Sequence, residues 1–290
     1  MYKAIADNKR NTVLIMAVFV AIIGAIGWVV SYAYGNTSVA YVVVICAVVY
    51  AFLQYFIATK LSVAMTGARQ IEKRDNPRLY RIVENLAITT GMQTPKIYII
   101  DDPAPNAFAT GRDPRHAIVA ATTGLLDMMS DSELEAVMAH EMGHVQNYDI
   151  RVGMIAFGLV SAIGFLSDIV LRMFIFGDDK EDNSPIVMII GLVLVILAPI
   201  VAAVVQMAVS RQREFLADAT SAMTTRNPDA MVSALEKLRQ GGRPMRHQNT
   251  ASAHLFFSNP LKPGFFNKLF STHPPLEDRI ARLRENASKF

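Results

Sequence analysis

Residues 130–144 read SDSELEAVMAHEMGH. Ser130 and Glu133 have the spacing of a capping box, which predicts that a helix begins here. Along that helix His140 and His144 are four residues apart, so their imidazoles share one face and can bind one metal ion together. Two histidines in this HExxH spacing are typical of zinc-dependent hydrolases, and chance rarely produces the pattern. The alternative is a pair of histidines on a solvated helix face, and a second motif argues against it.

The second motif lies at residues 210–218 and reads SRQREFLAD. Catalytic zinc usually keeps three protein ligands and one open position. Because the chain has a single cysteine, Cys46, the ligands must be His, Asp or Glu. Glu214 and Asp218 share a helix face, so we expect Glu214 to be the third ligand and Asp218 to accept a hydrogen bond from the far nitrogen of a ligand histidine. Alone, this acidic pair usually marks a solvated face; together with HExxH it predicts one zinc ion per chain.

The composition indicates that this site is attached to a membrane. Only 18% of the residues are charged and 52% are hydrophobic, whereas about 25% of the residues in a soluble domain are charged. The deficit is local, because residues 12–34, 39–59 and 186–209 contain no Asp, Glu, Lys or Arg and each is long enough to cross a bilayer as a helix. The chain is therefore expected to be an integral membrane protein with the lipid bilayer as a partner. A disordered chain, a disulfide scaffold and a secreted soluble enzyme are excluded.

The net charge of +3 gives no sign of a nucleic-acid partner, because the basic residues lie beside the apolar segments and form no helical stripe. Lys and Arg occur before the first apolar segment and after the second, but not in the turn at 35–38. By the positive-inside rule, the N-terminus and the zinc site are expected to be cytoplasmic.

A further span at 152–176 is less clear, because Asp168 and Arg172 interrupt the apolar run and charges are costly inside a bilayer. The alternative is a buried or interfacial helix. However, Glu214 must meet His140 on one side of the membrane, so the chain between them must cross an even number of times. We therefore expect four transmembrane helices in all.

This organisation divides the chain into four parts: an N-terminal transmembrane hairpin at 1–59, a first catalytic part at 60–151, a second hairpin at 152–209 and a second catalytic part at 210–290. In the soluble parts, besides the helices that carry the two motifs, local signals predict three further helices and three strands. The helices are expected between Pro77 and Gly91, near 228–240 and near 275–286, and the strands at 96–100, 106–110 and 116–121. The expected fold is a mainly α membrane protein with a cytoplasmic α+β domain and a small β-sheet.

Four motifs together resemble one family: NAFATG (106–111), HEMGH (140–144), SRQREFLADA (210–219) and THPP (272–275). With two apolar segments on either side of HEMGH, the chain resembles the HtpX-type membrane zinc metalloproteases, whose family also includes the CAAX prenyl protease. The resemblance covers nearly the whole chain. It implies a zincin-like (gluzincin) domain in the bacterial inner membrane. It also implies a protease that cleaves misfolded or damaged membrane and cytoplasmic proteins, as part of quality control and stress response.

Two residues are expected to act on the substrate's reacting atoms. Zinc would polarise the scissile carbonyl and lower the pKa of its bound water. Glu141, next to the first histidine, would take the proton of that water and deliver it to the leaving amine. His273 would stabilise the oxyanion or close the cleft, although a structural role before the last helix is an equal alternative.

Other residues are expected to bind substrate or support the site. Asn106, Ala107, Phe108 and Ala109 precede the catalytic helix and have strand character, so an extended substrate could add to them as a strand. The alternative is an ordinary sheet edge, and the resemblance favours substrate binding. Asp149 is a weaker candidate for supporting the metal site.

Two rival interpretations follow from other features. Asn227-Pro228-Asp229 is similar to a segment of site-2-type intramembrane proteases, in which an Asp is the third zinc ligand. A simpler interpretation is a helix start with proline in its first turn. The second rival is a non-catalytic membrane scaffold with a structural metal, which the lack of cysteine ligands disfavours.

Overall fold

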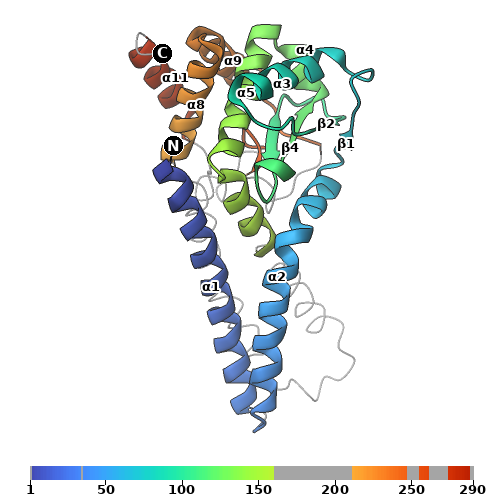
Figure 1. Cartoon of the computed structure of the whole chain (residues 1–290), viewed down its shortest axis with the longest axis vertical. Coiled ribbons are helices and arrows are strands. Elements are labelled where there is room, and N and C mark those ends of the chain that lie inside the picture. The colour runs from blue at the N-terminus through green and yellow to red at the C-terminus, as the bar shows by residue number, and fades with distance from the viewer. Residues whose placement is uncertain (1, 34, 160–210, 247–254, 261–273, 288–290) are drawn as a thin grey trace.

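Two long helices project from the rest of the molecule in the computed structural model, which describes residues 2–33, 35–159, 211–246, 255–260 and 274–287 (Figure 1). They are α1 (Tyr2–Ala33) and α2 (Ser38–Thr66), which contact each other near the turn that joins them and diverge toward the rest of the molecule (Figure 1). Ala6–Ala25 and Ala40–Thr66 are long and apolar enough to cross a membrane. The two expected N-terminal spans are thus present as candidate spans, and α2 continues beyond residue 59.

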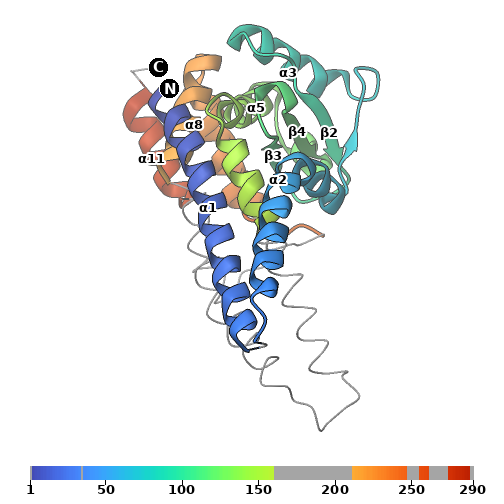
Figure 2. The same ribbon diagram turned by 60° about the horizontal axis from the view of Figure 1, so that its bottom comes forward.

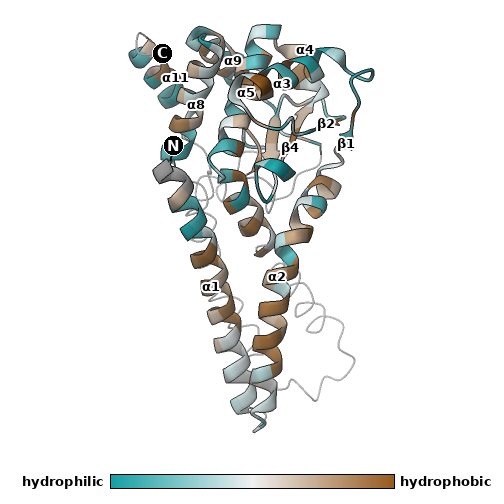
Figure 3. Ribbon diagram, in the orientation of Figure 1, coloured by the Kyte–Doolittle hydropathy of each residue, from teal (hydrophilic) through white to brown (hydrophobic). Residues whose placement is uncertain are grey.

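The outward faces of this hairpin are apolar. Leu14 and Phe52 expose 52% and 62% of their surface, and Figure 3 shows hydrophobic residues along the middle of both helices, whereas hydrophilic and hydrophobic residues alternate in the domain above them. A large continuous apolar surface of this kind is costly in water. Lipid is the environment that it fits.

A mixed four-stranded sheet lies at the centre of the domain. Its strands are β1 (Arg69–Gln70), β2 (Lys96–Ile100), β3 (Ala107–Thr110) and β4 (Ile118–Thr122), in the order β1-β2-β4-β3. Only β2 and β4 run parallel; the other two pairs are antiparallel. Strand β3 therefore lies at an edge.

The strand expected at 116–121 begins two residues later, and the turn before it explains the difference. Asp113 caps a short 3-10 helix, Pro114–His116, by accepting hydrogen bonds from the backbone N–H groups of Arg115 and His116. The 3-10 helix contains His116, which the sequence pattern alone would assign to the strand. Gly111, with φ of 146°, lies where an added Cβ would be 2.6 Å from the carbonyl oxygen of His116, so the turn requires glycine.

Helices pack against the sheet, and four of those in the described residues begin at a side-chain cap. Asn76 and Asn227 each accept a hydrogen bond at the start of a helix whose first residue is proline, and Ser130 and Glu133 form the expected capping box. The helices of the domain are α3 (Pro77–Thr90), α4 (Thr123–Met128), α5 (Asp131–Gln146), α8 (Arg211–Thr225), α9 (Pro228–Gly241) and α11 (Leu276–Asn286).

Two hydrophobic clusters cover the two faces of the sheet. The first joins Ala107 and Val119 to α3, α5 and α9. The second joins Phe108 on the other face to Ile15 and Phe19 of α1 and to Ala58 of α2. Successive residues of a strand point to opposite faces, so β3 is buried between the helical layer and the membrane hairpin. Figure 2 shows α5 beside the sheet and the N-terminal end of α1 next to α8.

Of the expected second hairpin at 152–209, the structure describes residues 152–159, which are helical and mostly buried. The remainder, including the candidate span at 186–209, lies outside the described residues, and so does His273.

Candidate active site

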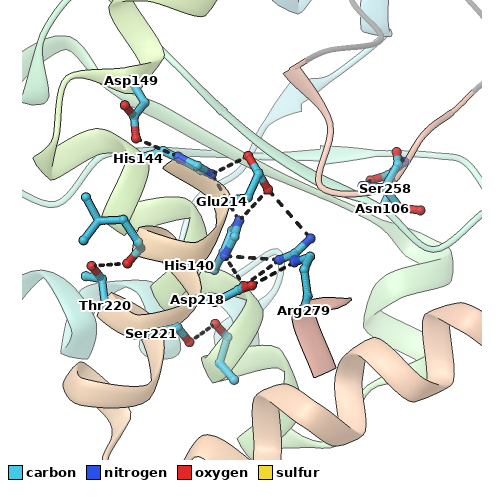
Figure 4. A network of polar contacts seen from close by, with 12 residues as sticks. Asn106, His140, His144, Asp149, Glu214, Asp218, Thr220, Ser221, Ser258 and Arg279 are labelled. Carbon is cyan, nitrogen blue, oxygen red and sulfur yellow. Dashed lines mark hydrogen bonds and ion pairs between the residues drawn. The ribbon is translucent and has the colours of Figure 1, made fainter. Parts of the chain in front are cut away.

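Three side chains from two helices meet in the interior, as the sequence predicts (Figure 4). His140 and His144 lie on α5, with their Nε2 atoms 3.1 Å apart. Glu214 of α8 places its carboxylate oxygens 3.6 Å from Nε2 of His140 and 3.5 Å from Nε2 of His144. The ligand atoms of these three residues all lie within 4.8 Å of one another. The expected metal-binding set is therefore brought together at one point.

Small residues allow α5 and α8 to come close enough for this meeting. Ser221 donates a hydrogen bond of 2.6 Å to the carbonyl oxygen of Ala136 on α5. A Cβ added at Gly143 would lie 3.3 Å from the side chain of Thr220, which is a tight contact. Glu214, Ala217 and Ser221 are spaced along the buried face of α8, and that periodicity aims the carboxylate at α5.

Each histidine is oriented by an acidic residue on its other nitrogen. Nδ1 of His140 lies 2.9 Å from Asp218, and Nδ1 of His144 lies 2.9 Å from Asp149. A carboxylate accepts a hydrogen bond, so each Nδ1 carries a proton and each Nε2 presents its lone pair. Asp218 and Asp149 thus lie where a carboxylate can orient each imidazole, and the roles expected for them stay predictions.

The donor set fits a zinc ion. Two lone pairs that face each other at 3.1 Å repel unless a cation or a proton lies between them. Two nitrogens at the usual zinc distance in a tetrahedral site are about 3.3 Å apart, close to the separation found here. Two imidazoles and one carboxylate, with an outer carboxylate on each imidazole, are the ligand chemistry of a catalytic zinc centre.

The acidic surroundings give the site a strong affinity for positive charge. Burial lowers the pKa of His144, but the hydrogen bond to Asp149 and the charges of Glu214, Asp149 and Glu141 outweigh it and raise the pKa to about 9. Without a metal the site would therefore hold a proton at neutral pH. A metal ion must displace that proton, so metal affinity falls as pH falls.

Arg279, which the sequence analysis did not single out, is part of the site. Its side chain is fully buried and donates hydrogen bonds of 2.6 and 2.9 Å to the two carboxylate oxygens of Asp218. It also lies 3.7 Å from Glu214 and stacks over the ring of Phe257, 4.7 Å from its centre. Burial raises the pKa of Asp218, but the Arg279 charge and the hydrogen bonds of Arg279 and His140 bring it below its usual range.

A signal for Arg279 was present in the sequence. The apolar stripe of α11 consists of Leu276, Ile280 and Leu283, and Arg279 has the same phase along the helix. A charged residue at an apolar position of an amphipathic helix indicates that the helix is assigned wrongly or that the charge is paired in the interior. What the sequence does not contain is the identity of its partner, because Asp218 lies on another helix.

Glu141 follows His140 on α5 and is buried, with 2% of its surface exposed. Its charge contributes to the raised pKa values of both His144 and Arg279. It therefore lies within electrostatic reach of the metal-binding set.

The edge of β3 is already paired, but with the chain's own residues. Phe108 forms a β-bridge with Phe256, and the backbone N–H of Phe257 donates to the carbonyl oxygen of Ala107 at 2.8 Å. The side chain of Asn106 holds both backbone groups of Ser258, its N–H at 3.0 Å and its carbonyl oxygen at 2.8 Å (Figure 4). A neighbouring strand thus fits this edge, and residues 256–258 occupy it.

The residues of the first rival interpretation lie elsewhere. Asn227 accepts a hydrogen bond from the backbone N–H of Ala230 as the cap of α9, and Asp229 is exposed in its first turn. The Asn-Pro-Asp segment is a helix start.

Comparisons with known proteins agree with this geometry. Peptidase family M48 matches residues 73–287. A "Protease HtpX homolog" of Tropheryma whipplei (strain Twist) is 56% identical over 291 residues, covering 100% of both chains. A "Protease HtpX homolog" of Streptococcus gordonii (strain Challis) is 43% identical over 295 residues, covering 98% of this chain and 99% of the relative. The crystal structure of S. mikatae Ste24p is similar in fold, with a TM-score of 0.52 at 20% identity, over 98% of this chain and 67% of that one.

Proposed function

Since the chain belongs to peptidase family M48, and is a membrane-anchored metalloprotease of the HtpX type, we propose that it is a zinc endopeptidase whose substrates are unfolded or damaged polypeptides. The observation that carries this proposal is the convergence of His140, His144 and Glu214 on one point. Three ligands leave one position open, which is where a catalytic zinc admits water and substrate.

His140, His144 and Glu214 would hold the metal, and Asp218 and Asp149 would keep the two imidazoles in the binding tautomer. A zinc ion held there supplies a Lewis acid that polarises the scissile carbonyl and acidifies a water molecule. Arg279 keeps Asp218 ionised and fixed in orientation through its paired hydrogen bonds.

Glu141 is the general base of the proposed reaction. Its carboxylate takes a proton from the attacking water and then gives that proton to the leaving amine nitrogen as the peptide bond breaks. The position of Glu141 next to His140, in a buried acidic site, supports this role.

The test is to purify the full-length protein in detergent, load it with zinc and follow the cleavage of casein. Glu141→Gln should keep stoichiometric zinc and reduce kcat by about a hundred- to ten-thousandfold, because a carboxamide cannot accept the proton. Glu135→Gln, an exchange on the more exposed side of the same helix, is the matched control. Full activity of Glu141→Gln would refute the assignment.

The substrate is proposed to bind along β3 as an added strand. Asn106 and the backbone of Ala107 already bind residues 256–258 in this manner, which supports the edge as a site for extended chains. Main-chain pairing tolerates many sequences, as an enzyme of quality control needs. Substrate can pair there only after residues 256–258 leave the edge.

The proposed topology has four spans, with the N-terminus and the zinc site in the cytoplasm of a bacterium, at the inner membrane. Lys3, Lys9 and Arg10 before the first span, and the uncharged turn at 35–38, support that orientation. A reporter enzyme that is active only outside the cytoplasm should be active when it is fused near Asp179. A cytoplasmic signal there would contradict either the four spans or the common zinc site.

A further inference from the structure

The membrane helix α1 reaches the metal site through Asn8. This side chain exposes 3% of its surface. Its amide nitrogen donates hydrogen bonds of 2.8 Å to the carbonyl oxygen of Asn147 and 2.6 Å to Oδ1 of Asp149. Both acceptors follow directly after the catalytic helix α5. A buried amide that donates both of its protons to one short loop fixes that loop against α1.

The other carboxylate oxygen of Asp149 contacts His144, one of the metal-binding residues. Oδ2 lies 2.9 Å from Nδ1 of His144, while Oδ1 receives Asn8 and lies 3.6 Å from Nε of Arg213. The two oxygens thus have different partners. A rotation of the carboxylate that satisfied one partner would lose the other.

The loop needs an external support. Asp149 is separated from α5 by the turn residues Asn147 and Tyr148, and Tyr148 has the left-handed φ of 62°. That conformation costs a non-glycine residue free energy and persists only where its surroundings hold it. Lys9, the neighbour of Asn8, lies over the Tyr148 ring at 5.0 Å from its centre. Two consecutive residues of α1 therefore hold the turn that places Asp149.

We propose that Asn8 is a positioning residue for the metal centre: it fixes Asp149, and through Asp149 it sets the tautomer and orientation of His144. The membrane anchor is in this way a structural part of the catalytic site. The inference rests on the proposed function in one respect, that His144 binds the metal. It assigns Asn8 no contact with substrate.

The test uses the full-length protein in detergent and measures zinc affinity by competition with a chelator, together with kcat and KM on casein. Outer partners of a ligand histidine typically change metal affinity by 10–100-fold. Asn8→Ala should therefore weaken zinc binding about tenfold and lower kcat with little change in KM. Asn11→Ala, one turn along α1, is the matched control. Equal zinc affinity and kcat in the two variants would overturn the proposal.

A second variant separates positioning from folding. Asn8→Leu keeps about the size of the side chain but donates no hydrogen bond to Asn147 or Asp149, so it should weaken zinc about as much as Asn8→Ala does. The absorption spectrum of the cobalt(II)-loaded protein should change as well, because it reports ligand geometry. If both variants melt at the wild-type temperature and both spectra are unchanged, Asn8 does not position the site.

A double-mutant cycle tests the route of the effect. In the Asp149→Asn background, Asn8→Ala should weaken zinc less than twofold, since the partner through which it acts is already altered. A full tenfold loss in that background would contradict the proposal. If the wild-type protein binds zinc but cleaves nothing, the proposed peptidase activity is contradicted. The effect of Asn8 can then still be measured as a change in zinc affinity. Wild-type protein that binds no zinc would overturn both.

Discussion

Arg279 holds two carboxylates, those of Asp218 and Glu214, in a fully buried place. Arg279→Lys keeps the charge but cannot make the paired hydrogen bonds to Asp218. We expect it to lower kcat about tenfold and to weaken zinc binding. The control is Arg282→Lys, at an exposed position on the same helix. Comparable zinc affinity and kcat in the two variants would show that Arg279 only fills space.

The ionisation of Glu133 makes the stability of the folded state depend on pH. Burial raises its pKa, but hydrogen bonds from Lys237, Ser233 and Ser130 outweigh burial and lower the pKa from 4.5 to about 2. A carboxylate with a lowered pKa in the folded state stabilises that state above pH 4.5. The stabilisation disappears as pH falls from 4.5 to about 2, because the unfolded chain takes up the proton first.

We therefore predict that Glu133→Gln lowers the melting temperature at pH 7, with a loss of roughly 1–3 kcal/mol. The difference between the variant and the wild type should shrink as the pH falls below 4.5 and disappear near pH 2. Circular dichroism melts of the detergent-solubilised protein across this range would measure it. A constant difference between the two proteins at every pH would contradict the assignment.

At the scale of elements, the distance between α5 and α8 decides whether the three ligands meet. Gly143→Ala would place a methyl group 3.3 Å from Thr220 and separate the helices by a few tenths of an ångström. We expect zinc affinity to fall several-fold, and Thr220→Ala in the same protein to restore part of it. Chelator competition measures both. No recovery in the double variant would mean that crowding against Thr220 is not the cause.

The bridge between Phe108 and Phe256 makes the movement of residues 256–258 testable. Bridge partners in antiparallel strands are close enough for a disulfide. In a protein with Cys46 replaced by Ser, Phe108→Cys with Phe256→Cys should be inactive on casein when oxidised and active when reduced. The reduced protein is its own control for the lost rings. If oxidised and reduced protein cleaved casein equally fast, substrate would not need this edge.

At the scale of the whole molecule, the membrane hairpin completes the hydrophobic core of the domain. Ile15 of α1 is 2% exposed in the cluster that contains Phe108, whereas its neighbour Leu14 is 52% exposed. Ile15→Ala should destabilise the protein by roughly 2–4 kcal/mol through the cavity that it leaves, while Leu14→Ala should cost much less. Thermal unfolding in detergent compares the two. Equal losses would show that α1 is an anchor without a packing role.

The limits of prediction from sequence follow from the range of the interactions. Helix starts at Asn76, Ser130 and Asn227 were predictable because each cap bonds its own helix. The cluster of His140, His144 and Glu214 was predictable because each of its two motifs, HExxH and ExxxD, has a spacing that lies within one helix. The short elements β1 and α4 were missed, because β1 has only two residues and is defined by its pairing with β2.

The same reasoning explains what was missed in the site. Asn8 and Asp149 are 141 positions apart, and Arg279 and Asp218 are 61 apart. No local periodicity links such pairs. A polar residue in an apolar phase shows that some partner exists, and only the fold shows which one.

We propose that His140, His144 and Glu214 bind one catalytic zinc ion in a membrane-anchored peptidase. Zinc X-ray absorption on the purified full-length protein tests this assignment. We predict one zinc per chain, two imidazole ligands, no sulfur, and oxygen in the remaining positions, with one oxygen ligand changed in Glu214→Ala and none in Asp229→Ala. An unchanged spectrum in Glu214→Ala, or fewer than two imidazoles in the wild type, would contradict the account.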